Sequence, residues 1–222
     1  MKLFSVVAGF VCFLSLSLAG GKPLAVQFVV QALPEGAEEF RLSDGRQVSE
    51  PFRLNIHGVS SAIKVGTRQL ILENRNNGSE LTSIALPEEG EEFVVFLYLA
   101  NDGEARPMKS SVLSLPGDFR PGTYFFINRT AEKIECDFGD GEVSIGPGAE
   151  ALLKPRLGDG KSTLNVEIHS VPLTEEGEEG AQKPLSRTRW PLTRTTRSYV
   201  FFTQNAAGTI DFRAVDEFVE EN

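Results

Sequence analysis

Short apolar runs recur along the chain, separated at intervals of roughly ten residues by Gly, Pro, Asn and Asp. Several runs alternate hydrophobic with polar residues, and the spacing of an amphipathic helix is absent. The pattern therefore predicts a chain made of β-strands. The expected strands are Leu24–Val30, Gln69–Leu72, Phe93–Leu99, Thr123–Ile127, Lys133–Phe138, Leu164–Ile168, Tyr199–Phe202 and Thr209–Val215.

Two kinds of strand can be distinguished by their hydrophobic pattern. Phe93–Leu99 and Tyr199–Phe202 are continuously apolar, which is typical of strands covered on both faces. In contrast, Leu164, Val166 and Ile168 alternate with polar residues, as in a strand with one face in water. We expect the first kind to be central in the fold.

These strands favour an all-β fold of two tandem antiparallel β-sandwich domains of the Ig-like kind. The expected first domain covers residues 22–107 and the second covers residues 108–217. The joint near residues 104–111 contains no flexible linker, so we expect the two domains to pack on each other. One continuous sandwich is the alternative.

A similar order of strands and turns occurs twice along the chain, which predicts an internal duplication. An apolar strand opens each half, and the runs Glu88–Glu92 and Glu175–Glu179 precede the two continuously apolar strands. Gly66–Gly78 and Gly148–Gly160 are matching segments of equal length. Chance recurrence of common turn residues is the alternative.

The N-terminus has the features of a secretory signal peptide. Lys2 supplies a positive charge, and Leu3–Leu18 is an uncharged apolar run. Ser17 and Ala19 are small residues at the positions that signal peptidase requires, so residues 1–19 are the expected signal and cleavage falls between Ala19 and Gly20. We expect a secreted or periplasmic protein with no transmembrane segment after cleavage. An uncleaved membrane anchor is the alternative.

Charge and cysteine content narrow the choice of partner and compartment. The chain has 22 basic and 31 acidic residues and a net charge of −9, which argues against nucleic acid as a partner. Cys136 is the only cysteine of the mature chain, so no intramolecular disulfide can form. Alternation places Cys136 on the same face as Ile134 and Phe138, which predicts a buried, reduced and inert thiol.

The sequence contains no recognisable catalytic machinery. His57 and His169 are the only histidines, and neither has Cys or carboxylate residues at metal-ligand spacing. We therefore expect no enzyme activity, no catalytic residues, no structural metal and no cofactor. Asp137, Asp140 and Glu142 could bind calcium weakly through oxygen ligands, with a solvated acidic turn as the alternative.

One segment is basic although the whole chain is acidic. Residues 181–210 contain no Asp or Glu, and they include the expected partner-binding residues Arg187, Arg189, Arg194 and Arg197. On a strand, Arg187 and Arg189 would share one face and Trp190 would occupy the other. The pattern indicates a contact site for an acidic partner. The alternative is that the arginines pair with the acidic residues Glu175–Glu179 of the same chain.

A resemblance to other proteins rests on turn motifs. The stretches Pro121–Thr130, Ile134–Phe138 and Ile145–Gly148 resemble a pattern in uncharacterised secreted proteins of environmental bacteria, which resemble Ig-like sandwich modules. In those modules a strand, an Asn-x-Thr turn, a second strand and a Pro-Gly turn form one edge. The resemblance implies a fold and no activity.

Together these features predict an exported, non-catalytic β-sandwich protein that presents a surface to another protein or to an envelope polymer. A carbohydrate-binding module is one alternative, which requires exposed aromatic residues, although Trp190 is the only tryptophan. A hydrolase with an undetected carboxylate pair is the other.

Overall fold

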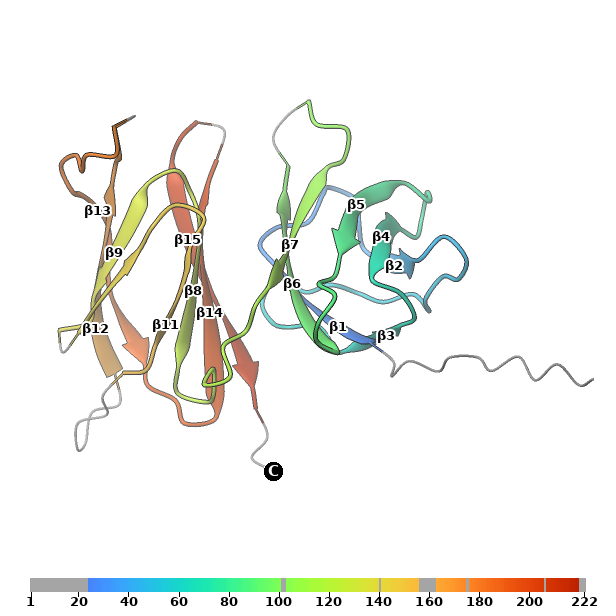
Figure 1. Cartoon of the computed structure of the whole chain (residues 1–222), viewed down its shortest axis with the longest axis horizontal. Helices are drawn as coiled ribbons and strands as arrows, with labels where there is room; N and C mark the ends of the chain where they lie inside the picture. Colours follow the sequence, from blue (N-terminus) through green and yellow to red (C-terminus); the bar gives the residue numbers. More distant parts are fainter. Residues whose placement is uncertain are drawn as a thin grey trace, which may run out of the picture.

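The computed structural model describes residues 24–100, 103–139, 141–155, 163–174, 176–205 and 207–219. Within these residues every helix or strand assigned is a strand, fifteen in all, as the hydrophobic pattern predicts. The strands form four sheets, which Figure 1 shows as four successive layers. The expected signal peptide lies outside the described residues.

The first domain consists of two sheets. Outer sheet 1 has the order β2 (Phe40–Ser43), β4 (Gln69–Asn74), β5 (Glu80–Ala85). Inner sheet 1 has the order β3 (Ile63–Val65), β1 (Leu24–Val30), β6 (Glu92–Leu99), β7 (Met108–Leu113). Because β7 pairs with β6, the first domain extends past the expected boundary at residue 107, and the connection to the second domain spans residues 114–123.

The second domain also consists of two sheets. Inner sheet 2 has the order β11 (Glu150–Leu153), β8 (Tyr124–Arg129), β14 (Thr196–Gln204), β15 (Ile210–Phe218). Outer sheet 2 has the order β10 (Glu142–Ile145), β9 (Lys133–Asp137), β12 (Thr163–Val171), β13 (Lys183–Pro191). Among the described strands none pairs with a strand of the other domain, which favours two sandwiches over one continuous sandwich.

The two domains repeat one strand topology. Each inner sheet contains a central parallel pair, β1 with β6 and β8 with β14, and the other neighbours are antiparallel. The outer sheets are antiparallel, and β2-β4-β5 corresponds to β9-β12-β13 with β10 added at the edge. The sandwich is compatible with Ig-like modules, but a central parallel pair departs from the fully antiparallel sheets of the immunoglobulin fold.

The shared topology supports an internal duplication, although two of the expected matches between the halves are wrong. The strand in Gly66–Gly78 is β4 of outer sheet 1, whereas β11, the strand that follows Gly148, belongs to inner sheet 2. The acidic run Glu88–Glu92 ends at the first residue of β6, whereas Glu175–Glu179 lies between β12 and β13. The opening strands β1 and β8 and the apolar strands β6 and β14 do correspond.

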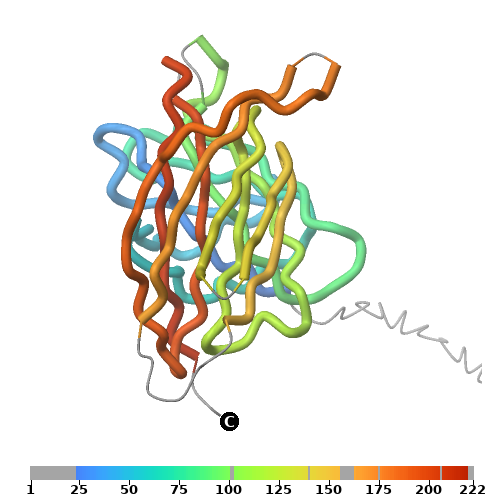
Figure 2. Tube along the Cα trace, turned by 90° about the vertical axis from the view of Figure 1, so that its left-hand side faces the viewer, coloured from blue at the N-terminus to red at the C-terminus, as the bar shows by residue number. Residues whose placement is uncertain are grey.

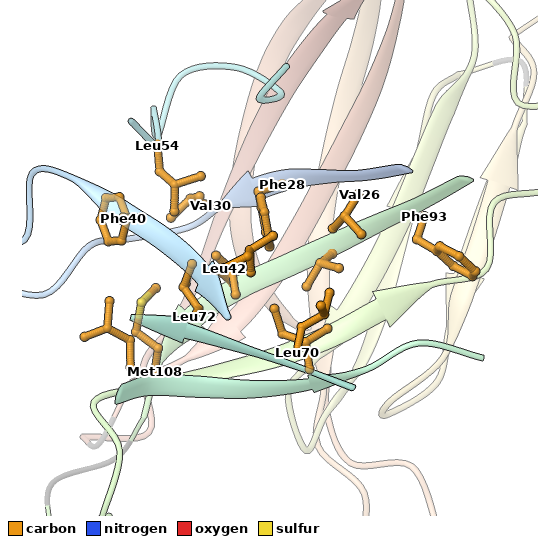
Figure 3. Packing of buried hydrophobic residues seen from close by; sticks show 14 of the residues in the cluster. Val26, Phe28, Val30, Phe40, Leu42, Leu54, Leu70, Leu72, Phe93 and Met108 are labelled. Atoms are coloured by element: carbon orange, nitrogen blue, oxygen red, sulfur yellow. The ribbon is translucent and has the colours of Figure 1, made fainter. Parts of the chain in front are cut away.

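Three apolar cores fill the spaces between the four sheets. The first core lies within the first domain and includes Phe28 and Phe40 (Figure 3). The second lies within the second domain, where the ring of Trp190 packs against Tyr124 and Phe126. Full burial of one such side chain contributes roughly 1.5–3 kcal/mol, so each core is a major source of stability.

The third core joins the two inner sheets and therefore the two domains. At its centre the rings of Phe96 and Phe201 stack with centroids 3.9 Å apart and planes 8° apart. Phe96 comes from β6 and Phe201 from β14, and their neighbours Val95 and Val200 face the cores within the domains. Both strands are thus central and covered on both faces, as their continuous apolar sequences predict.

Candidate functional site

The outer face of outer sheet 2 carries two of the sequence-predicted arginines, Arg187 and Arg189, both of them exposed, and Figure 2 looks onto this face. Alternation on β12 buries Leu164, Val166 and Ile168 in the core, so the residues between them point outward. On β13 the same period buries Trp190 and leaves Arg187 and Arg189 exposed. The predicted sharing of one face by these two arginines is confirmed.

Strand register brings four charged residues into one row across this face. Glu142 lies opposite Asp137, Asp137 opposite Glu167, and Glu167 opposite Arg187. Carboxylates directly opposite each other repel, and the positive charge of Arg187 at the end of the row offsets part of this repulsion. Its Nε lies 3.0 Å from Oε1 of Glu167, but 84% of its side chain is exposed, so the pair adds roughly 0–1 kcal/mol.

A hollow of about 460 Å³ lies beside this row. Its walls include Asn165, Glu167 and Arg189, and Gly139 contributes no side chain that would fill it. Arg189 faces Asn165 across the strands, and within the described residues it makes no ion pair or side-chain hydrogen bond. Its guanidinium group is therefore free to donate to a partner.

The other two predicted arginines lie elsewhere. Arg197 donates to Oε2 of Glu217 at 2.7 Å and to the backbone oxygen of Phe119 at 3.1 Å. Its guanidinium carbon also lies 4.8 Å from the centre of the Phe119 ring. Arg197 therefore fixes the connection between the domains to β14 and β15. Arg194 is exposed in the connection between β13 and β14, away from the row.

The alternative, that the arginines pair with acidic residues of the same chain, holds for Arg187 with Glu167 and for Arg197 with Glu217. The described part of the segment Glu175–Glu179, however, pairs with a different cation. Glu179 accepts a hydrogen bond from Nζ of Lys133 at 2.6 Å, and Glu135 is a second partner of this ammonium group. The Lys133 hydrogen bond outweighs desolvation and holds the pKa of the Glu135 carboxyl below its usual range. Glu175 lies outside the described residues.

The described residues contain no group of His, Cys, Asp and Glu side chains that could hold a metal ion. Of the three residues considered for weak calcium binding, Asp137 and Glu142 face each other across β9 and β10, whereas Asp140 lies outside the described residues. Oδ1 of Asp137 accepts the backbone N–H of Gly139 at 2.6 Å. The two histidines lie in different domains, His57 in the first and His169 on β12.

Sequence reasoning missed the hollow and the charged row. Alternation along β12 already showed that Glu167 points outward, but its position opposite Arg187 depends on the register between two strands. Trp190 is only 8% exposed, so it is unavailable as a platform for a sugar ring. Within the part of the chain that the structure describes, no helix is long and apolar enough to cross a membrane.

Comparison with known proteins adds no relative to this picture. No protein-family model matches the chain, and no curated protein is similar to it.

Proposed function

We propose that the protein is an exported, non-catalytic binding protein that presents the outer face of outer sheet 2 to an acidic protein or envelope polymer. The apolar N-terminal run with Ala19 before Gly20 supports export, and the resemblance in turn motifs favours a bacterial envelope. Intact-mass analysis of the exported protein should give the mass of a chain that begins at Gly20. A mass that includes residues 1–19 would contradict cleavage.

One observation carries the binding proposal: Arg187 and Arg189 stand side by side, exposed, on an edge strand above a polar hollow. Arg197, in contrast, is held by internal partners. Arg189 makes no ion pair with the described residues, so its guanidinium group can donate two parallel hydrogen bonds to a carboxylate or phosphate of a partner.

The edge position also indicates how the partner binds. β13 contains Pro184 and ends at Pro191, and proline lacks the N–H that an added strand would need. We therefore expect the partner to contact the side chains of β13, not to add a strand to the edge of the sheet. Because Asp137, Glu142 and Glu167 lie farther across the face, an acidic partner meets favourable charge only at the β13 edge.

Fluorescein-labelled poly-L-glutamate is a suitable probe for this surface. Replacing Arg187→Gln and Arg189→Gln together should weaken its binding about tenfold, which corresponds to about 1.4 kcal/mol, while the melting temperature hardly changes. Fluorescence anisotropy at increasing salt measures the affinity, which should fall as the Debye length drops below about 10 Å.

A matched control removes the same charge from the first domain. Arg46→Gln with Lys64→Gln changes two exposed cations far from outer sheet 2, and it should leave binding unchanged. If both double variants weaken poly-L-glutamate binding equally, the probe is attracted to the whole surface and the proposal is wrong. Unchanged binding in the variant of Arg187 and Arg189 would also contradict the proposal.

A further inference from the structure

The strand registers and contacts of the two inner sheets correspond to each other as if related by an approximate local two-fold axis. Val29 pairs with Phe96 on β1 and β6, and Ile127 pairs with Phe201 on β8 and β14. All four side chains lie in the shared third core, so Val29 corresponds to Ile127 and Phe96 to Phe201. The two equivalent phenylalanines stack on each other, which places them at the axis.

Two polar contacts between the domains are related by the same symmetry. Arg129 donates to Oγ of Ser111 at 3.1 Å, and Arg213 donates to the backbone oxygen of Gln31 at 2.8 Å. Gln31 corresponds to Arg129, because Gln31 lies two residues after Val29 and Arg129 lies two residues after Ile127. Ser111 corresponds to Arg213, because Ser111 pairs with Phe96 and Arg213 pairs with Phe201. The interface thus resembles the self-complementary interface of a two-fold dimer.

A groove of about 440 Å³ opens on this axis, where the C-terminal ends of the four central strands meet. In Figure 1 the β6–β7 and β14–β15 hairpins rise on either side of this end. Small-molecule sites are commonly of this size and lie at domain interfaces. Three equivalent pairs contribute to its lining, namely Gln31 and Arg129, Tyr98 and Thr203, and Lys109 and Asp211.

The cations of the groove already have partners within the protein. Nζ of Lys109 lies 2.7 Å from Oε1 of Glu104, and Nη2 of Arg129 lies 2.7 Å from Oε1 of Glu150. Asp211 forms no ion pair with any described residue, although its Oδ1 accepts a backbone N–H. No uncompensated positive charge therefore lines the groove, which argues against an anionic ligand.

The groove also offers an aromatic surface. The ring of Tyr98 stacks on Phe96 with centroids 5.3 Å apart, and its hydroxyl makes no hydrogen bond with the described residues. The next residue, Leu99, leaves 43% of its surface exposed. The ring and free phenol of Tyr98 therefore line the groove together with Asp211 and Asn205, and Leu99 contributes to its rim.

We propose that this axial groove binds a neutral, hydroxyl-rich ring, that is, a mono- or disaccharide. The C–H face of a sugar ring matches the aromatic surface of Tyr98. Its hydroxyl groups can donate to the carboxylate of Asp211 and both donate to and accept from the Tyr98 hydroxyl. This site lies apart from outer sheet 2, so the inference does not depend on the proposed function.

Isothermal titration calorimetry of the mature full-length chain with glucose, maltose, cellobiose and chitobiose tests the groove. At least one of these sugars should bind, and Tyr98→Ala or Asp211→Asn should each weaken that binding roughly tenfold, because each removes a central contact. Tyr98→Phe keeps the aromatic face and should lose less affinity than Tyr98→Ala. Glu167→Gln on outer sheet 2 is the matched control, and it should bind the sugar normally.

Two further measurements make the outcome decisive. Circular dichroism melting of each variant separates loss of a contact from loss of the fold, and poly-L-glutamate binding should be the same in Tyr98→Ala as in the unchanged protein. Absence of binding for all four sugars would overturn the proposal, as would sugar binding that is unaffected by Tyr98→Ala. Binding of the diamine putrescine that depends on Asp211, without sugar binding, would overturn it in favour of a cationic ligand.

Discussion

At the scale of single residues, Cys136 shows how a two-residue period decides chemistry. The side chain is 1% exposed between Ile134 and Phe138 of the second core, and β9 directs its charged neighbours outward. Burial raises the pKa of the Cys136 thiol to about 12, because the thiolate would lose its hydration. The sequence-based prediction of a buried thiol is confirmed.

We expect this thiol to resist reagents until the protein unfolds. Because its pKa is raised in the folded state, its contribution to stability is fully present below about pH 8.5, the ordinary pKa of a thiol, and is lost progressively as the pH rises from there through the folded pKa of about 12. Cys136→Ser should lower the free energy of unfolding by roughly 1–3 kcal/mol, since a hydroxyl enters the core. Labelling with a thiol reagent measures the accessibility of Cys136, and denaturant titration measures the free energy of unfolding of Cys136→Ser. Rapid labelling of the native protein would contradict burial.

At the scale of elements, Asn128 fastens the turn between β8 and β9. The side chain is fully buried, and its Nδ2 donates to the backbone oxygens of Glu132 at 2.8 Å and Ile145 at 3.0 Å. Its Oδ1 accepts the backbone N–H of Thr130 at 2.9 Å. One amide thus joins the end of β8, the turn and the end of β10, which explains the Asn-x-Thr motif by structure.

Replacing this amide should therefore cost more than replacing an exposed one. Asn128→Ala leaves several buried backbone groups without partners, and we expect a loss of at least about 2 kcal/mol in the free energy of unfolding. Asn77→Ala is the control, because Asn77 lies in an exposed turn and its Oδ1 accepts only the Ser79 N–H, so its cost should stay within about 0.5 kcal/mol. Urea titration measures both, and equal costs would refute the bracing role of Asn128.

At the scale of the whole molecule, the shared third core should make the two domains unfold together. Trp190 is the only tryptophan, and because it lies in the second core its fluorescence reports on the second domain alone. Circular dichroism, in contrast, reports on strands of both domains. The two signals should change at the same denaturant concentration in the unchanged protein.

The stacked pair at the axis provides the sharper test of this coupling. Phe96→Ala should destabilise the protein by about 3–5 kcal/mol, because it leaves a cavity between the inner sheets. Combined with Phe201→Ala, the effects should be non-additive by about 0.5–1.5 kcal/mol, the range for contacting aromatic pairs. Strict additivity, or separate transitions for the two signals in the unchanged protein, would show that the domains are independent.

The sequence by itself determined those features that depend on which way a side chain points along one strand. The two-residue period predicted the burial of Cys136 and the shared face of Arg187 and Arg189, and the continuously apolar run predicted the central position of Phe93–Leu99. These are local properties, since the period places successive side chains on opposite faces whatever the strand pairs with.

Only the tertiary structure decided which strands lie next to each other. The parallel pairs, the assignment of Met108–Leu113 to the first domain, the meeting of Glu167 with Arg187, and the axial groove all join segments far apart in the chain. Arg197, grouped by sequence with the exposed arginines, belongs instead to an internal cluster with Glu217. Strand partners and register are fixed by the fit of whole faces and by distant turns, and a local run of residues does not contain that information.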